Sequence, residues 1–189
     1  MNLHVLGDAL DFWKGCLLNR LTSAGLLRDL EVQPLLTDHR GWREPDRALY
    51  AELLMVGRQA IHPHTEVNNA SDLFLDPDIG VQTSPVPVAE QGNYVRPTEV
   101  ARLANASPDR VVAVYQHVRR RRVRDRVEAV VAALQAVDPA LSVCSVESGT
   151  VAMLFVSRNA ERADSIHLYF CGVFQNRAPV RTHLWTATA

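Results

Sequence analysis

The chain has 189 residues, of which 47% are hydrophobic and 22% are charged. These values are ordinary for a globular protein, and a chain of this length is expected to form a single domain. The composition excludes an intrinsically disordered chain and a collagen-like repeat. Three cysteines without a recurring spacing also exclude a disulfide framework and a cysteine-rich metal site.

The near-neutral net charge of −1 conceals an uneven distribution of charge. Lys14 is the only lysine, and one octapeptide, residues 119–126, holds six arginines and one aspartate. This block carries a local charge of +5 in a chain whose remainder carries −6. Guanidinium groups bind phosphate well, so we expect phosphate contacts from Lys14, Arg119, Arg120, Arg121 and Arg122. The alternative is a solvated helix face whose arginines pair with acidic residues.

Features of targeting and membrane insertion are absent from the sequence. No apolar run approaches the roughly 18–20 residues that span a bilayer. The first residues lack the basic segment of a signal peptide and include Asp8. An odd number of cysteines fits free thiols in a reducing compartment. We therefore expect a cytoplasmic protein that does not contact membranes.

The first predicted elements alternate between strands and helices. Residues 3–6 predict a short strand that ends at Gly7 and Asp8, and the apolar spacing over 13–24 predicts a helix. Residues 32–36 predict a second strand, and residues 45–60 predict a helix that begins at Pro45. Residues 73–75 form an apolar strand that stops abruptly at Asp76-Pro77-Asp78.

The second half of the chain continues this pattern after a long aperiodic loop over residues 81–97. A short helix is predicted over 98–106, a strand over 111–115 and a clear amphipathic helix over 123–137. Two hairpins are predicted, the first from residues 141–146 and 151–157, the second from 166–174 and 180–185. We expect one α/β domain over 1–189, with a mainly parallel, Rossmann-like sheet flanked by helices and a C-terminal antiparallel hairpin. Its core would be 1–157, and a β-hairpin extension would cover 164–186.

Polar residues follow four of these strands, where open α/β sheets bind ligands. They are Asp8 and Asp11 after the first strand, Asp38 and His39 after the second, Asp76 and Asp78 after the third, and Gln116 and His117 after the fourth. Clustered carboxylates repel one another unless a cation neutralises them, and Mg²⁺ and Mn²⁺ prefer oxygen ligands.

These residue types predict a divalent metal site with hydrolytic chemistry. The expected ligands of Mg²⁺ or Mn²⁺ are Asp8, Asp38, Asp76 and Asp78. The last two would lie at the catalytic centre, with His117 or His39 as the acid–base group. The alternative is that each aspartate only caps the helix or turn that follows it.

One segment carries a resemblance to a known family. Leu73-Phe74-Leu75-Asp76-Pro77-Asp78 is similar to the strand-four motif of amino-methyltransferases, which often reads Asp-Pro-Pro-Tyr. The strand order, ending in the 141–157 hairpin, resembles the class I methyltransferase fold, whose last two strands form such a hairpin. The resemblance covers 1–157 and implies methyl transfer to nucleic acid from S-adenosylmethionine. The glycine-rich cofactor loop is missing, since residues 7–11 read Gly-Asp-Ala-Leu-Asp, so S-adenosylmethionine is not an expected cofactor.

Three short motifs are also similar to an uncharacterised bacterial protein family, namely Gly7-Asp8, Asp76-Pro77-Asp78-x-Gly80 and Tyr115-Gln116-His117. Three functions therefore stay open. The first is a metal-dependent hydrolase, a nuclease or phosphodiesterase, acting on nucleic acid or a phosphorylated small molecule. The second is a methyltransferase-like protein without a standard cofactor loop, and the third is a non-catalytic module that binds nucleic acid or a partner.

Overall fold

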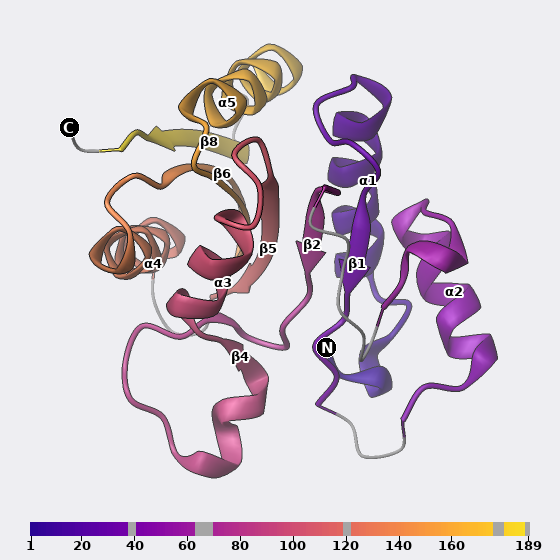
Figure 1. The fold of residues 1–189 in the computed structure, drawn as a ribbon. Coiled ribbons are helices and arrows are strands. Elements are labelled where there is room, and N and C mark those ends of the chain that lie inside the picture. The colour runs from indigo at the N-terminus through magenta and orange to yellow at the C-terminus, as the bar shows by residue number, and fades with distance from the viewer. Residues whose placement is uncertain (38–40, 63–69, 119–121, 176–179, 188–189) are drawn as a thin grey trace.

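A six-stranded mixed sheet lies between two layers of helices (Figure 1). The computed structural model describes residues 1–37, 41–62, 70–118, 122–175 and 180–187. In spatial order the strands are β1 (Glu31–Gln33), β2 (Leu73–Leu75), β5 (Val111–His117), β7 (Val151–Ser157), β6 (Ser142–Ser148) and β8 (Val180–Trp185). The α/β class and the flanking helices are confirmed.

The sheet is mixed rather than mainly parallel. Strands β1, β2 and β5 are parallel, whereas the pairs β5–β7, β7–β6 and β6–β8 are antiparallel. The predicted hairpin of β6 and β7 explains this change of direction. Only Gly149 and Thr150 separate the two strands, and so short a connection can join only antiparallel neighbours.

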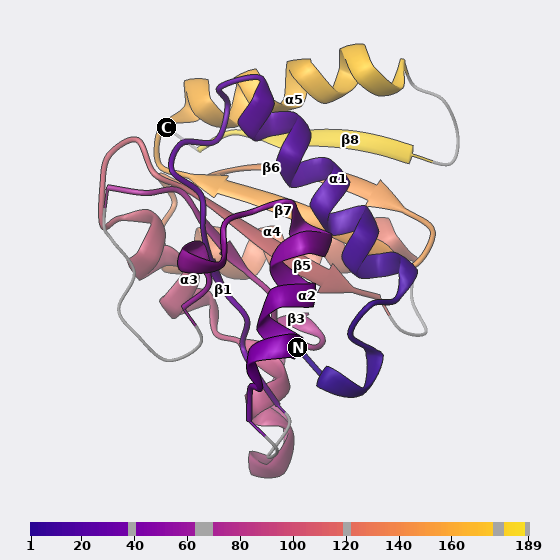
Figure 2. The same ribbon diagram turned by 90° about the vertical axis from the view of Figure 1, so that its right-hand side faces the viewer.

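The helices cover both faces of the sheet (Figures 1 and 2). Helices α1 (Ala9–Ser23), α2 (Glu44–Leu54) and α5 (Ala160–Phe174) pack on one face, and α3 (Pro97–Ala104) and α4 (Val123–Val137) pack on the other. Along β5, Val111, Ala113 and Tyr115 belong to the first layer, while Val112 and Val114 belong to the second. Burial on both faces explains why this strand is a continuous apolar run. No helix in the described part of the chain is long and apolar enough to cross a membrane.

Two predicted strands are helical instead. Residues Leu3–Val5 form a 3₁₀ turn, η1, which is capped by the side chain of Asn2, because this side chain accepts a hydrogen bond from the His4 amide. The Asp8 side chain caps the helix that follows, α1, by accepting hydrogen bonds from the amides of Leu10 and Asp11. The expected hairpin extension over 164–186 is also wrong, since 160–174 is helix α5.

Helix α5 begins at Asn159, whose side chain accepts hydrogen bonds from two backbone amides. Its buried side chains Ala163, Ile166 and Phe170 recur at helical spacing. Of the predicted second hairpin, only β8 is a strand, and it pairs with β6.

The predicted loop at 81–97 contains short elements and projects beyond the carboxyl end of β2 (Figures 1 and 2). These are β3 (Gly80–Val81), η3 (Val88–Asn93) and β4 (Tyr94–Val95), and a further 3₁₀ turn, η2, covers Arg58–Ala60. The buried Gln116 side chain fixes the start of this segment. Its carbonyl oxygen accepts from the Val81 amide at 3.0 Å, and its amide group donates to the carbonyl oxygen of Ile79 at 2.9 Å.

Two glycines allow close approaches that any side chain would block. At Gly80, where φ is +130°, a Cβ atom would lie 2.3 Å from Oε1 of Gln116. At Gly15 in α1, a Cβ atom would lie 1.9 Å from the backbone oxygen of Leu53 in α2. The first contact shapes the chain beside the candidate site, and the second lets α1 and α2 pack closely.

Candidate functional site

A pocket of about 210 Å³ lies at the carboxyl ends of β2 and β5. It is lined by five of the residues predicted from the sequence, namely Asp8, Lys14, Asp76, Asp78 and His117. Asp38, His39 and residues 119–121 lie outside the described residues. The structure therefore brings together the described candidates from residues 8–14, 76–78 and 117.

Local structure explains how each segment reaches the pocket. Asp8 caps α1, and Asp11 and Lys14 follow on the same helix with i, i+3 spacing. Asp76 is the first residue after β2. Because side chains alternate along a strand, Tyr115 and His117 of β5 point to the same face of the sheet, which α1 covers.

Lys14 is the centre of a buried network of charges. Its Nζ lies 2.9 Å from Oδ1 of Asp11 and 2.9 Å and 3.0 Å from the two carboxylate oxygens of Asp76. The hydroxyl of Tyr50 donates to Asp76 at 2.6 Å. The Lys14 ammonium also lies 4.3 Å from the centroid of the Tyr115 ring, a cation–π contact. Lys14 is thus the cation shared by Asp11 and Asp76, and the three side chains together carry a charge of −1.

The network fixes the protonation states of its members. Burial lowers the pKa of Lys14, but the ion pairs with Asp76 and Asp11 outweigh it, so that the pKa is raised overall. Burial raises the pKa of Tyr50 well above its usual value, and the charge of Asp76 adds to this effect. Burial also raises the pKa of Tyr115. Near neutral pH the lysine is therefore charged, and both phenols keep their protons.

The mouth of the pocket carries ionisable groups outside the Lys14 network. Asp8 is exposed, and Asp78 and His117 are half-buried. The hydroxyl of Tyr115 lies 3.2 Å from Nδ1 of His117, which orients the imidazole. Two carboxylates and a titratable ring thus border a small cavity with a charged lysine in its wall.

A divalent cation in this pocket would have to be held by the carboxylates at its mouth. Within the described ranges, no group of three or more His, Cys, Asp or Glu side chains is placed to hold a metal ion. Both oxygens of Asp76 already contact Lys14. Mg²⁺ commonly uses one or two carboxylates and completes its shell with water and phosphate oxygens. Asp8 and Asp78 are the described carboxylates of the pocket outside the Lys14 network, and Oδ1 of Asp8 also accepts hydrogen bonds from the amides of Leu10 and Asp11 as the cap of α1.

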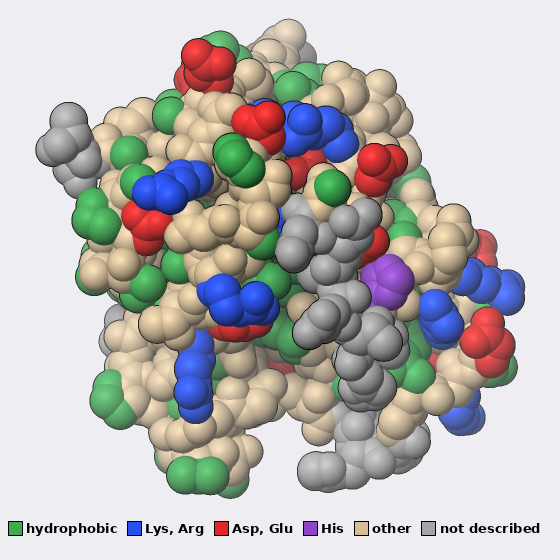
Figure 3. Space-filling model, viewed as in Figure 1, with side chains coloured by type: hydrophobic (Ala, Val, Ile, Leu, Met, Phe, Trp, Pro, Cys, Tyr) green, Lys and Arg blue, Asp and Glu red, His purple; other side chains and the backbone are tan. Residues whose placement is uncertain are grey.

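Two of the arginines in the basic block have structural roles. Arg124 pairs with Glu128 at 2.7 Å and stacks on the ring of Trp185. Arg126 donates to the carbonyl oxygen of Val81 at 2.6 Å, which ties α4 to the projecting segment. Arg122, at the start of α4, is exposed. On the face seen in Figure 3, basic and acidic side chains are interspersed rather than gathered in one basic patch.

Three members of the network were assigned no catalytic, metal-binding or phosphate-binding role from the sequence. Asp11 was expected at this edge of the sheet, and its i, i+3 spacing from Lys14 is a signal that the two charges lie together on a helix. Tyr115 shares a strand face with His117, so the period of two would have found it. Tyr50 has no such signal, since only the packing of α2 brings its hydroxyl to Asp76.

Comparison of the chain with protein-family models, with curated proteins and with solved structures gives no match. The function of the site is therefore inferred from the side chains that line it.

Proposed function

We propose that the pocket beside Lys14 is the active site of a metal-dependent phosphoester hydrolase that acts on nucleic acid or a phosphorylated small molecule. The observation that carries this proposal is the convergence of Asp8, Asp78 and His117 at the mouth of one pocket with a charged lysine in its wall. These residues come from three distant parts of the sequence. They combine carboxylates that can hold a cation with an imidazole that can transfer a proton.

Each residue has a distinct role in this proposal. Asp8 and Asp78 would hold Mg²⁺ or Mn²⁺, which supplies charge neutralisation at the phosphate and a more acidic bound water. His117 transfers the proton, since histidine titrates near neutral pH, and Tyr115 orients its ring. Lys14 holds Asp11 and Asp76 in place, and the positive charge that attracts the phosphate would come from the metal ion. The exposed Arg122 is the described candidate for contacts with more distant phosphates.

Cleavage assays test this proposal directly. Wild-type protein with Mg²⁺ or Mn²⁺ is expected to hydrolyse bis(p-nitrophenyl) phosphate or a labelled oligonucleotide. His117→Gln is expected to lower the rate by about 10²–10⁴-fold, the usual contribution of a general acid or base. Asp78→Asn should abolish the metal dependence, whereas Asp125→Asn, on the exposed part of α4, should leave the rate unchanged. An unchanged rate in Asp78→Asn and His117→Gln, or no cleavage with either metal, would contradict the proposal.

A methyltransferase-like protein with a Rossmann-like core is the second candidate. It is supported by the β6–β7 hairpin and by the acidic turn Asp76-Pro77-Asp78 directly after β2. The parallel strands β1, β2 and β5, with the pocket at their carboxyl ends, add to this support. A rise in melting temperature with S-adenosylmethionine would favour this candidate, and no shift at saturating ligand would count against it. Failure of both assays would leave the non-catalytic binding module.

A further inference from the structure

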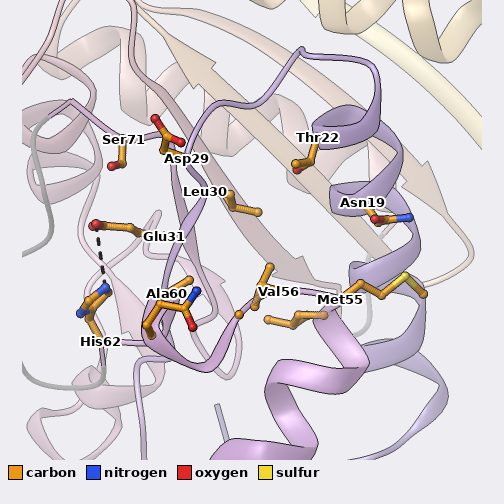
Figure 4. A pocket seen from close by; sticks show the side chains of 13 residues that line it. Asn19, Thr22, Asp29, Leu30, Glu31, Met55, Val56, Ala60, His62 and Ser71 are labelled. Atoms are coloured by element: carbon orange, nitrogen blue, oxygen red, sulfur yellow. Dashed lines mark ion pairs between the residues drawn. The ribbon is translucent and has the colours of Figure 1, made fainter.

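A concavity of about 540 Å³ lies at the amino ends of β1 and β2, away from the Lys14 pocket (Figure 4). Two of its polar side chains, Glu31 and His62, already face each other, with 3.9 Å between carboxylate and imidazole. A ligand there would have to break this pair. A pair of side chains with nucleophilic and basic groups lies elsewhere, where α5 packs on β8.

Cys171 and His167 form a thiol–imidazole pair on α5. Their i, i+4 spacing places the two side chains on the same face of the helix. Sγ of Cys171 lies 3.5 Å from Nε2 of His167 and 3.1 Å from Oγ1 of Thr182 in β8. All three side chains are half-buried. The thiol is therefore within reach of solvent, of a base and of a second hydrogen-bonding group.

This arrangement contains the parts of an activated nucleophile. The reactive form of a cysteine is its thiolate, and His167 is placed to take the thiol proton, as an adjacent base does for other cysteine nucleophiles. The Thr182 hydroxyl is placed to donate a hydrogen bond to the sulfur once the proton has left. Asp164 is spaced i, i+3 from His167, so a carboxylate lies one turn from the imidazolium that forms.

Within the described part of the chain, no such arrangement surrounds the other two cysteines. Cys144 in β6 is 0% exposed, and burial raises the pKa of its thiol. Cys16 in α1 is half-buried like Cys171, but the residues four positions before and after it, Phe12 and Arg20, cannot accept its proton. Cys16 therefore resembles Cys171 in exposure and differs from it in lacking a base.

We propose that Cys171 is a modification site that reacts with a small organic disulfide to form a mixed disulfide. The Cys171 thiolate attacks one sulfur of this compound, the bond between its two sulfurs breaks, and one half leaves as a thiolate. The leaving thiolate takes the proton that His167 removed from Cys171. Cys171 is thereby oxidised and the leaving half is reduced, so no other oxidant is needed. The bound half displaces Thr182 from Sγ and weakens the contact between α5 and β8.

Dithiodipyridine, a neutral disulfide whose leaving group absorbs light, tests the proposal on the native protein at neutral pH. In the wild type, peptide mass spectrometry after short exposures is expected to show adduct on Cys171 at a rate at least about tenfold higher than on Cys16. Absorbance should show a fast phase that Cys171→Ser removes and Cys16→Ser keeps. Cys144 should react only in urea, and its protection shows that a variant is folded.

Replacing the base tests its part in the reaction. His167→Gln should slow the reaction of Cys171 by about tenfold or more, because glutamine cannot take the proton. His4→Gln, the same change at an exposed histidine of η1, is the matched control and should react as the wild type does.

Three results would overturn the proposal. A rate at Cys171 no higher than that at Cys16 in the wild type does so without any variant. The others are a fast phase that is lost in Cys16→Ser and an unchanged rate in His167→Gln with Cys144 still protected. Phosphoester cleavage by Cys171→Ser is expected to match that of the wild type, so this proposal and the proposed hydrolase fail independently.

Discussion

Replacing Lys14 with methionine tests how the candidate site is held together. Methionine keeps an unbranched apolar stem but removes the ammonium group, which leaves Asp11 and Asp76 at 4% and 1% exposure without their cation. Removing one partner of a buried ion pair costs about 3–5 kcal/mol. Because domains of this size are stable by only about 5–15 kcal/mol, we expect a large loss. Urea denaturation followed by circular dichroism measures the free energy of unfolding.

The chain offers an exposed ion pair of the same spacing as a control. Arg102 pairs with Glu99 at i, i+3, with side chains 64% and 46% exposed. Arg102→Met is expected to cost less than about 1 kcal/mol, because water screens such pairs. The double variant Lys14→Met, Asp76→Asn should cost less than the sum of its single changes, because the amide leaves one buried carboxylate, Asp11, without a cation instead of two. If Lys14→Met costs no more than Arg102→Met, the account of Lys14 as the cation shared by Asp11 and Asp76 is wrong.

Three further variants, two of them with a glycine control, test the packing and the ionisation of the site by the same denaturation assay. Gly15→Ala is expected to cost about 1–3 kcal/mol through its contact with the α2 backbone. Gly172→Ala in α5 should be neutral or stabilising by up to about 1 kcal/mol, because a Cβ atom there would have no neighbour within 4 Å. Equal changes in stability in Gly15→Ala and Gly172→Ala would contradict the close approach of α1 and α2. Gly80→Ala should lower the free energy of unfolding more than Gly149→Ala does. Both glycines have positive φ, but only a Cβ atom at Gly80 would also meet a buried side chain, that of Gln116. A larger loss of stability in Gly149→Ala would refute this. The folded-state pKa of Tyr50 is raised above the ordinary 10.0, so its contribution to stability is fully present below pH 10 and is lost as the pH rises towards the folded-state value. Tyr50→Phe should therefore lose less stability between neutral and alkaline pH than the wild type, and an equal loss would contradict burial of the phenol.

The sequence predicted best those elements that have long, regular patterns. Helix α4 lies at 123–137 as its apolar spacing indicated, and the β6–β7 hairpin lies where the Gly149 turn predicted it. The failures were short apolar runs. Residues 3–6 and 166–174 are rich enough in apolar side chains for a strand, but periodicity cannot separate a short strand from a buried helix segment. The side chain of Asn2 caps the 3₁₀ turn in the first run, and the side chain of Asn159 caps the helix that contains the second.

The candidate site shows what patterns can and cannot reveal. Asp8 was expected to follow a strand, yet it reaches the pocket as the cap of α1. Asp8 nevertheless lines the same pocket as Asp76, Asp78 and His117, because the first turn of α1 lies at the same edge as the ends of β2 and β5. That Lys14 pairs with Asp76 could not be predicted, since it depends on how α1 packs against the sheet. The same holds for Tyr50, which α2 delivers from a distance in sequence.

Binding of Mn²⁺ measured by isothermal titration calorimetry tests the proposed hydrolase site most directly. The account predicts that the wild-type protein binds Mn²⁺ and that Asp8→Asn and Asp78→Asn each weaken this binding at least about tenfold, as expected for the loss of a charged ligand. Asp125→Asn, an exposed carboxylate on α4, should bind Mn²⁺ as the wild type does. Absence of Mn²⁺ binding, or equal binding by wild type, Asp8→Asn and Asp78→Asn, would contradict a metal site at the mouth of the Lys14 pocket.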